Sequence, residues 1–281
     1  MRRTITTATM ALAMVAMLAV VADGAPRPPR PRPEPPAMDT GGNFASICRF
    51  SHRLPDDPIV APGAPGASHS HDFFGNTTTD ANSTYASLQA GDTTCNREAD
   101  TAAYWVPTLS SGGRQIRPLG VQAYYNARGK EGVEPPPADL RIIAGDGHAQ
   151  APQPIAIVAW HCGERMREGL SQTPPSCEDG RLLRLQIRFP DCWDGANLDS
   201  ADHKSHMAYS RRATCPSTHP VPLAGLRLTV TYPISDGIGA TLSSGGVLTG
   251  HADFFNAWDQ DELARLTEFC LNGHHACGRR G

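Results

Sequence analysis

Arg181-Leu-Leu-Arg-Leu-Gln-Ile-Arg-Phe189 carries the clearest structural signal in the chain. In an extended segment its leucines at 183 and 185, with Ile187 and Phe189, lie on one face, and the polar residues between them lie on the other. This period of two is typical of a half-buried β-strand. Leu226-Arg-Leu-Thr-Val-Thr-Tyr232 repeats the pattern and ends at Pro233.

Other apolar segments indicate more strands, namely residues 103–109, 140–143 and 155–160, the last of which predicts a central strand because it is almost continuously apolar. The chain has 27 glycines and 25 prolines, which break these runs at short intervals. A helix is predicted from about Asp259, with Leu263, Leu266 and Phe269 on one face. We therefore expect an all-β fold, a β-sandwich or a jelly-roll-like arrangement with long loops and a short C-terminal helix.

The first 43 residues have the features of an export segment. Arg2 and Arg3 precede an uncharged stretch whose apolar run at 10–21 has the length of a signal sequence, so residues 1–22 are predicted to be a signal peptide. A retained membrane anchor is the alternative. Residues 23–43 are expected to be a proline-rich, disordered tether. We therefore expect a secreted protein with no membrane span after signal cleavage.

Residues 44–281 are expected to form a single disulfide-stabilised β domain. An even number of cysteines in an exported chain implies four disulfides, and pairing in sequence order is the simplest arrangement. A four-cysteine zinc site is the alternative, but the chain has no CxxC motif. The eight cysteines are Cys48, Cys95, Cys162, Cys177, Cys192, Cys215, Cys270 and Cys277.

The charge balance restricts the possible partners. The net charge is −3, and five arginines lie in the export segment, so the remaining chain is more acidic still. This balance argues against nucleic acid as a partner. We expect a monomer whose partner is an extracellular or cell-wall polysaccharide.

Three segments combine histidine with aspartate and are interpreted as loops that carry the chemistry. The first is Ser68-His-Ser-His-Asp-Phe-Phe-Gly-Asn76, in which His69 and His71 would project from one face and Asp72 from the other. The second runs from residue 191 to 206. The third, at 250–259, repeats the Asp-Phe-Phe-x-Asn pattern approximately, which suggests that the first and third segments converge.

These segments predict a site that binds a metal or transfers protons. Imidazoles would hold a divalent ion, zinc, copper or calcium, and aspartates would complete its ligands or act as general bases. The predicted metal ligands are His69, His71, His206 and His251. The predicted catalytic residues are His71, Asp72, Asp194, His206 and Asp253. The predicted substrate contacts are Trp193, Asn197, Asn256 and Trp258.

Three interpretations of the same residues stay open. The protein would be a hydrolase or lyase acting on polysaccharide in the first interpretation, and a non-catalytic carbohydrate- or metal-binding module in the second. Alternatively, the histidines and aspartates form a buried hydrogen-bond network that holds the loops. Residues 194–199 also offer oxygen ligands for calcium, although they do not match an EF-hand loop.

Several blocks together resemble the domain-of-unknown-function family DUF1996, which consists of secreted proteins of actinobacteria and fungi. The resemblance covers residues 46–262 and implies an extracellular setting without an established activity. In fungi such domains occur beside carbohydrate-binding modules, which favours polysaccharide as the partner. The blocks are Asp56-Asp-Pro-Ile-Val60, Pro62-Gly-x-Pro-Gly66, His69-x-His-Asp-Phe-Phe-Gly-Asn76, Cys192-Trp-Asp-Gly195, Asn197-x-Asp199, His203-x-x-His206-x-x-Tyr209, Cys215-Pro-x-x-His219-Pro220 and His251-x-Asp-Phe-x-Asn-x-Trp258.

Overall fold

The strand β1 (Asn43–Leu54) connects the two halves of the main sheet. In the computed structural model, which describes residues 41–163 and 169–278, the first half of β1 pairs with β6 (Gly120–Asn126) and the second half with β2 (His71–Gly75). The pairing register with β2 shifts between Phe50 and Arg53. Such a bulge bends a strand, so β1 can belong to both halves.

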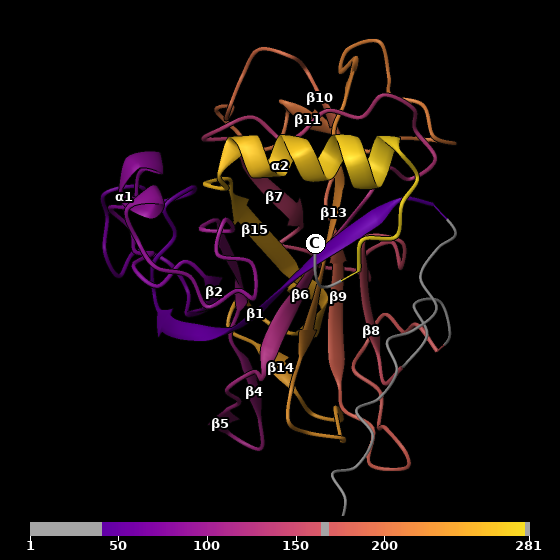
Figure 1. The fold of residues 1–281 in the computed structure, drawn as a ribbon. Coiled ribbons are helices and arrows are strands. Elements are labelled where there is room, and N and C mark those ends of the chain that lie inside the picture. Colours follow the sequence, from indigo (N-terminus) through magenta and orange to yellow (C-terminus); the bar gives the residue numbers. More distant parts are fainter. Residues whose placement is uncertain (1–40, 164–168, 279–281) are drawn as a thin grey trace, which may run out of the picture. The chain divides into compact units, whose positions relative to one another are not determined.

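All pairings in the nine-stranded sheet are antiparallel. The edge strand β7 contacts β9, which lies next to the opposite edge, so the sheet curls and its two halves face each other (Figure 1). The all-β class with long loops is confirmed. The strand order is β7 (Arg141–Gly145), β15 (His251–Phe255), β3 (Ala103–Pro107), β2, β1, β6, β13 (Gly225–Thr231), β9 (Arg184–Arg188) and β8 (Val158–His161).

Two small sheets and four helical segments complete the described structure. Figure 1 shows α2 crossing one end of the main sheet and α1 beside β2. The small sheets are β11 (Met207–Ala208), β10 (Cys192–Trp193) and β12 (Val221–Pro222), and β14 (Thr241–Leu242), β4 (Leu109–Ser111) and β5 (Arg114–Gln115). The helical segments are α1 (Tyr85–Gln89), η1 (Val247–Thr249), α2 (Gln260–Leu266) and η2 (Thr267–Asn272).

The inner face of the sheet is apolar, and so is the part of the outer face that covers β2, β3 and β15. The inner face forms the main core, where Phe44 stacks on Tyr125 with ring centroids 4.7 Å apart. On the outer face, Phe73 and Trp105 belong to a second apolar cluster with Ile59. Because β2 and β3 are buried on both faces, the polar side chains they carry are also withdrawn from water.

Two details of the predicted elements were wrong. Residues 155–160 do not form a central strand, since β8 starts at Val158 and lies at the sheet edge. Trp160 is nevertheless fully buried, because its indole packs in the main core, 6.4 Å between ring centroids from Tyr232. The helix starts as predicted, with Asp259 as its N-cap. Phe269 is 55% exposed, however, because the π-helical turn of η2 rotates Cys270 and Leu271 toward the core instead.

The four disulfides join the cysteines in sequence order, as predicted: Cys48–Cys95, Cys162–Cys177, Cys192–Cys215 and Cys270–Cys277. No cysteine is left free. Within the described ranges, none of the helices has both the length and the apolar character needed to cross a membrane. The predicted signal peptide and nearly all of the predicted tether lie outside the described residues.

Candidate metal centre

The first and third histidine segments converge, but as strands rather than loops. Their Asp-Phe-Phe motifs lie in β2 and β15, which pair with the two sides of β3. His71 lies opposite Pro107 of β3, and continuing the β15–β3 register places His251 opposite the same residue. Side chains at alternate strand positions share a face, so His71 and His251 emerge on the outer face of the sheet.

Three imidazoles meet over this part of the sheet. The ring centroid of His69 lies 4.2 Å from that of His71 and 5.1 Å from that of His251. One ring nitrogen from each histidine lies within 4.8 Å of the others. We call His69, His71 and His251 the histidine centre. His71 and His251 are buried, and His69 is partly exposed, so solvent reaches the centre from the side of His69.

Backbone hydrogen bonds fix the tautomers of the two buried histidines. His71 Nδ1 donates to the carbonyl of Asp56 at 2.9 Å, and His251 Nδ1 donates to the carbonyl of Thr249 at 2.9 Å. A carbonyl only accepts, so each Nδ1 carries the proton and each neutral ring keeps a lone pair on Nε2. Metal-binding histidines commonly have this outer hydrogen bond, which orients the ring.

Two carboxylates adjoin the histidine centre. Ligand atoms of Asp57, His71 and Asp253 lie within 4.8 Å of one another. Both oxygens of Asp253 and the Nε2 atoms of His69 and His71 are buried without a hydrogen-bond partner in the described part of the chain. Buried polar atoms are normally paired, and His71 belongs both to the group of three histidines and to the group with the two carboxylates.

The surroundings keep the histidine centre uncharged. Burial lowers the pKa of His71 to about 3, helped by the nearby His69, and burial with the nearby His71 lowers the pKa of His251 to about 3. Burial, followed by the charge of Asp57, raises the pKa of Asp253 well above its usual range. Neutral imidazoles at neutral pH have the protonation state that metal coordination requires.

Asp72, a predicted catalytic residue, lies on the opposite face of β2. Arg53 Nε donates to Asp72 Oδ1 at 2.6 Å, and Thr108 Oγ1 donates to the same oxygen at 3.2 Å. Asp72 thus forms a buried ion pair away from His71. The reason is the pleat, which sends neighbouring side chains to opposite faces.

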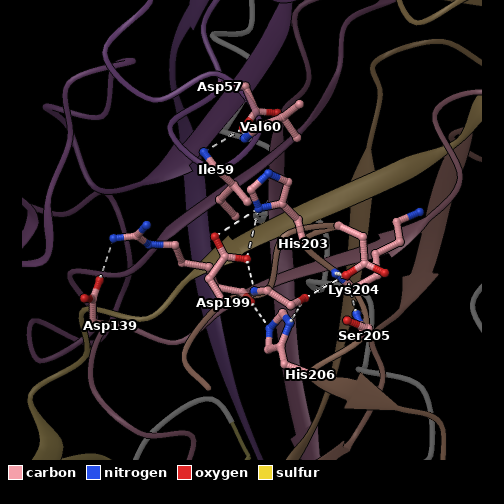
Figure 2. A network of polar contacts seen from close by, with 12 residues as sticks. Asp57, Ile59, Val60, Asp139, Asp199, His203, Lys204, Ser205 and His206 are labelled. Carbon is pink, nitrogen blue, oxygen red and sulfur yellow. Dashed lines mark hydrogen bonds and ion pairs between the residues drawn. The ribbon is translucent and has the colours of Figure 1, made fainter. Parts of the chain in front are cut away.

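The segment 191–206 does not join the histidine centre, which differs from the predicted arrangement. His206 Nδ1 bonds Ser200 Oγ at 2.9 Å, and its Nε2 bonds the Arg141 carbonyl at 2.7 Å, so neither nitrogen is free for a metal. Figure 2 shows His203 joined to Asp199, a contact of 3.0 Å. These bonds hold the loop to itself and to β7.

Asp194 organises a turn rather than a site. Its Oδ1 accepts the backbone amides of Ala196 and Asn197, and its Oδ2 accepts Asn197 Nδ2. Burial alone would raise the pKa of Asp194, but these hydrogen bonds lower it overall. Trp193 Nε1 donates to the carbonyl of Asn197 at 2.7 Å. Because the turn uses these oxygens, the geometry does not favour calcium there.

The other two predicted substrate contacts are fully buried. Asn256 Nδ2 donates to the carbonyls of Pro136 and Pro137. Trp258 Nε1 donates to the hydroxyls of Tyr104 at 3.0 Å and Tyr125 at 3.2 Å. Neither side chain reaches a substrate in this structure, because both close the core beneath α2.

Sequence reasoning left two residues beside the histidine centre out of the predicted site. Asp57 follows Asp56 in a loop where its Oδ1 accepts the amides of Ile59 and Val60 (Figure 2). The Asp56-Asp57-Pro motif was a signal for it, although an ordered turn explained the motif equally well. Gly147 carried no signal, and a Cβ there would lie 3.2 Å from the His251 ring.

The fold and the geometry define an all-β, disulfide-bonded protein with a buried centre of histidines and aspartates. The chain belongs to the family described as Domain of unknown function (DUF1996), whose model matches residues 57–258. The match spans β2, β3 and β15 and therefore the whole histidine centre. Comparison with curated proteins and with solved structures gives no match.

Proposed function

We propose that this protein is a secreted metal-binding protein that holds one divalent transition-metal ion at the histidine centre. The observation that carries the proposal is the convergence of three neutral imidazoles, with the free Nε2 atoms of His69 and His71 buried and unpaired. Asp253 supplies a carboxylate as a further ligand. Nitrogen-rich ligands of this kind favour zinc or copper over calcium.

The buried setting is compatible with both a catalytic and a purely binding role. A bound metal would act as a Lewis acid and lower the pKa of a coordinated water. A hydrolase or lyase acting on polysaccharide would use this chemistry at the side of His69. Among the described residues, Trp105, Trp160 and Trp258 are fully buried, so these three indole rings offer no surface to a polysaccharide. Polysaccharide as the partner stays a prediction.

Secretion is the second component of the proposal. It is supported by four disulfides in sequence order and by the absence of free cysteines. Disulfides form and persist in oxidising compartments. Detection of the protein in the culture medium of its source cells, with a chain shortened by the predicted signal peptide, tests this component.

Elemental analysis after equilibration with zinc or copper and dialysis tests the metal proposal. We expect a stoichiometric amount of metal in the wild type and its loss in His71→Gln and His251→Gln. His219→Gln is the matched control, because His219 binds the carbonyl of Ser205 outside the centre. A folded wild type that retains no metal, or a His71→Gln/His251→Gln double variant that retains all of it, would overturn the proposal.

A further inference from the structure

A cavity of about 470 Å³ shares no lining residue with the histidine centre. It is bordered by the loop that follows β6, by β9 and by the loop near residue 212. Four of its lining residues are cationic, Arg128, Lys130, Arg188 and Arg212, and one is acidic, Glu131. A volume of this size is in the range of small-molecule sites.

Three of these cations share a single carboxylate. Lys130 Nζ contacts Asp191 Oδ2, Arg128 Nε lies 3.7 Å from the same oxygen, and Arg188 Nη2 lies 3.4 Å from Oδ1. Asp191 also accepts the amide and the hydroxyl of Ser210 at 2.9 and 2.8 Å. One negative charge therefore faces three positive ones, which leaves an excess of positive charge beside the cavity.

The cations also keep unused hydrogen-bonding capacity. The Nε atoms of Arg128 and Arg188 are buried and lack a hydrogen-bond acceptor among the described residues. Burial and the neighbouring Arg188 lower the pKa of Arg128 only to about 10, so it stays charged at neutral pH. A buried charged donor without an acceptor is costly, and an anion in the adjoining cavity would offset the unbalanced positive charge.

The backbone around the cavity is strained. Arg128, Arg212, Ala213 and His274 line it with φ values of 53°, 50°, 61° and 57°. This left-handed conformation costs energy for residues other than glycine, and such residues cluster at ligand-binding sites. All four residues line the same cavity although they come from three separate segments of the chain.

We propose that this cavity binds a small ligand, the size of an acidic monosaccharide, through an oxyanion group held by the guanidinium groups of Arg128, Arg188 and Arg212. The planar fork of arginine matches carboxylate, sulfate and phosphate oxygens. Lys130 stays on Asp191 and orients the site. The carboxylate of Glu131 faces the ligand's charge and weakens its binding.

Calorimetric titration of the full chain with glucuronate, inorganic sulfate and inorganic phosphate, at constant ionic strength, tests the proposal. We expect saturable binding that Arg212→Ala weakens about tenfold, the effect of one charge-assisted hydrogen bond. Arg211→Ala is the matched control, because Arg211 is exposed like Arg212 but does not line the cavity. Glu131→Gln should tighten binding.

Binding of glucuronate alone would support an acidic sugar, and binding of all three probes would support recognition of the oxyanion group itself. No saturable binding of any probe would overturn the proposal. Equal weakening by Arg211→Ala and Arg212→Ala would also overturn it, since that result indicates diffuse surface charge. Zinc retention by Arg212→Ala should equal that of the wild type, because the two sites share no residue.

Discussion

His71 and His251 face each other across a strand that contributes neither of them. Their ring centroids are 5.8 Å apart and their planes are nearly perpendicular, at 89°. Strands in a sheet are about 4.8 Å apart, so two strands separated by a third lie about twice that distance from each other. Pro107 of β3 lies between the two histidines. The ring centroids are closer together than the two strands, so both imidazoles tilt toward each other above Pro107.

Metal should stabilise the folded protein. A ligand that binds only the native state at a hundred times its Kd adds about 2.7 kcal/mol to the free energy of unfolding. We therefore expect zinc to raise the Tm measured by circular dichroism and EDTA to reverse the increase. The His71→Gln variant should show no response, while His219→Gln should respond as the wild type does. A zinc response of equal size in all three proteins would contradict the assignment.

Gly147 should control metal affinity without being a ligand. Its added Cβ in Gly147→Ala would lie 3.2 Å from His251 Cε1, so the ring must move. Changes that disturb the orientation of a ligand typically weaken metal binding about tenfold. Gly41→Ala is the control, because nothing lies within 4 Å of its added Cβ. Competition with a chromogenic zinc chelator measures both affinities, and equal affinities would show that His251 has room to adjust.

Arg53 should stabilise the folded protein, because its guanidinium pairs with the buried carboxylate of Asp72. Burial raises the pKa of Asp72, and its contact with Arg53 opposes the increase. Arg53→Met leaves Asp72 buried without its charge partner, which typically costs about 3–5 kcal/mol. Adding Asp72→Asn should recover most of that loss, as measured by urea unfolding. If the Arg53→Met variant were as stable as the wild type, solvent would have to reach Asp72.

Asp100 should make stability depend on pH. Burial raises its pKa to about 7 in the folded protein, although the Tyr104 hydroxyl donates to both of its oxygens at 3.1 Å. The folded state holds this proton more tightly than the unfolded chain, so the stability Asp100 contributes is complete below pH 3.8 and is lost as pH rises toward 7.

Asp100→Asn removes this dependence. The stability of the variant relative to the wild type should rise by about 1.4 kcal/mol per pH unit between pH 4 and 7 and then level off. Urea unfolding at a series of pH values measures the difference. A difference that is constant with pH would show that Asp100 is ionised in the folded protein throughout.

The sequence predicted those parts of the protein that depend on local periodicity. The alternation in 181–189 became β9, and the shared Asp-Phe-Phe pattern correctly indicated that the segments of His71 and His251 converge. Loop residues were harder to place, because no periodicity shows whether a histidine such as His206 bonds to a ligand or to a backbone carbonyl. Trp258 was predicted to contact a substrate but is buried in the core, because its burial depends on tertiary packing that the neighbouring residues in the sequence do not reveal.

The bulge in β1 limits where chains of this family can gain or lose residues. Deleting one residue between Phe50 and Arg53 removes the register shift that sets β2 against β1. A slip of one residue exchanges the two faces of a strand. It would turn Asp72 and Phe74 outward and send His71 into the apolar core. Insertions in surface loops are tolerated far better, so homologous chains should vary in their loops while the spacing from Phe50 to Arg53 stays constant.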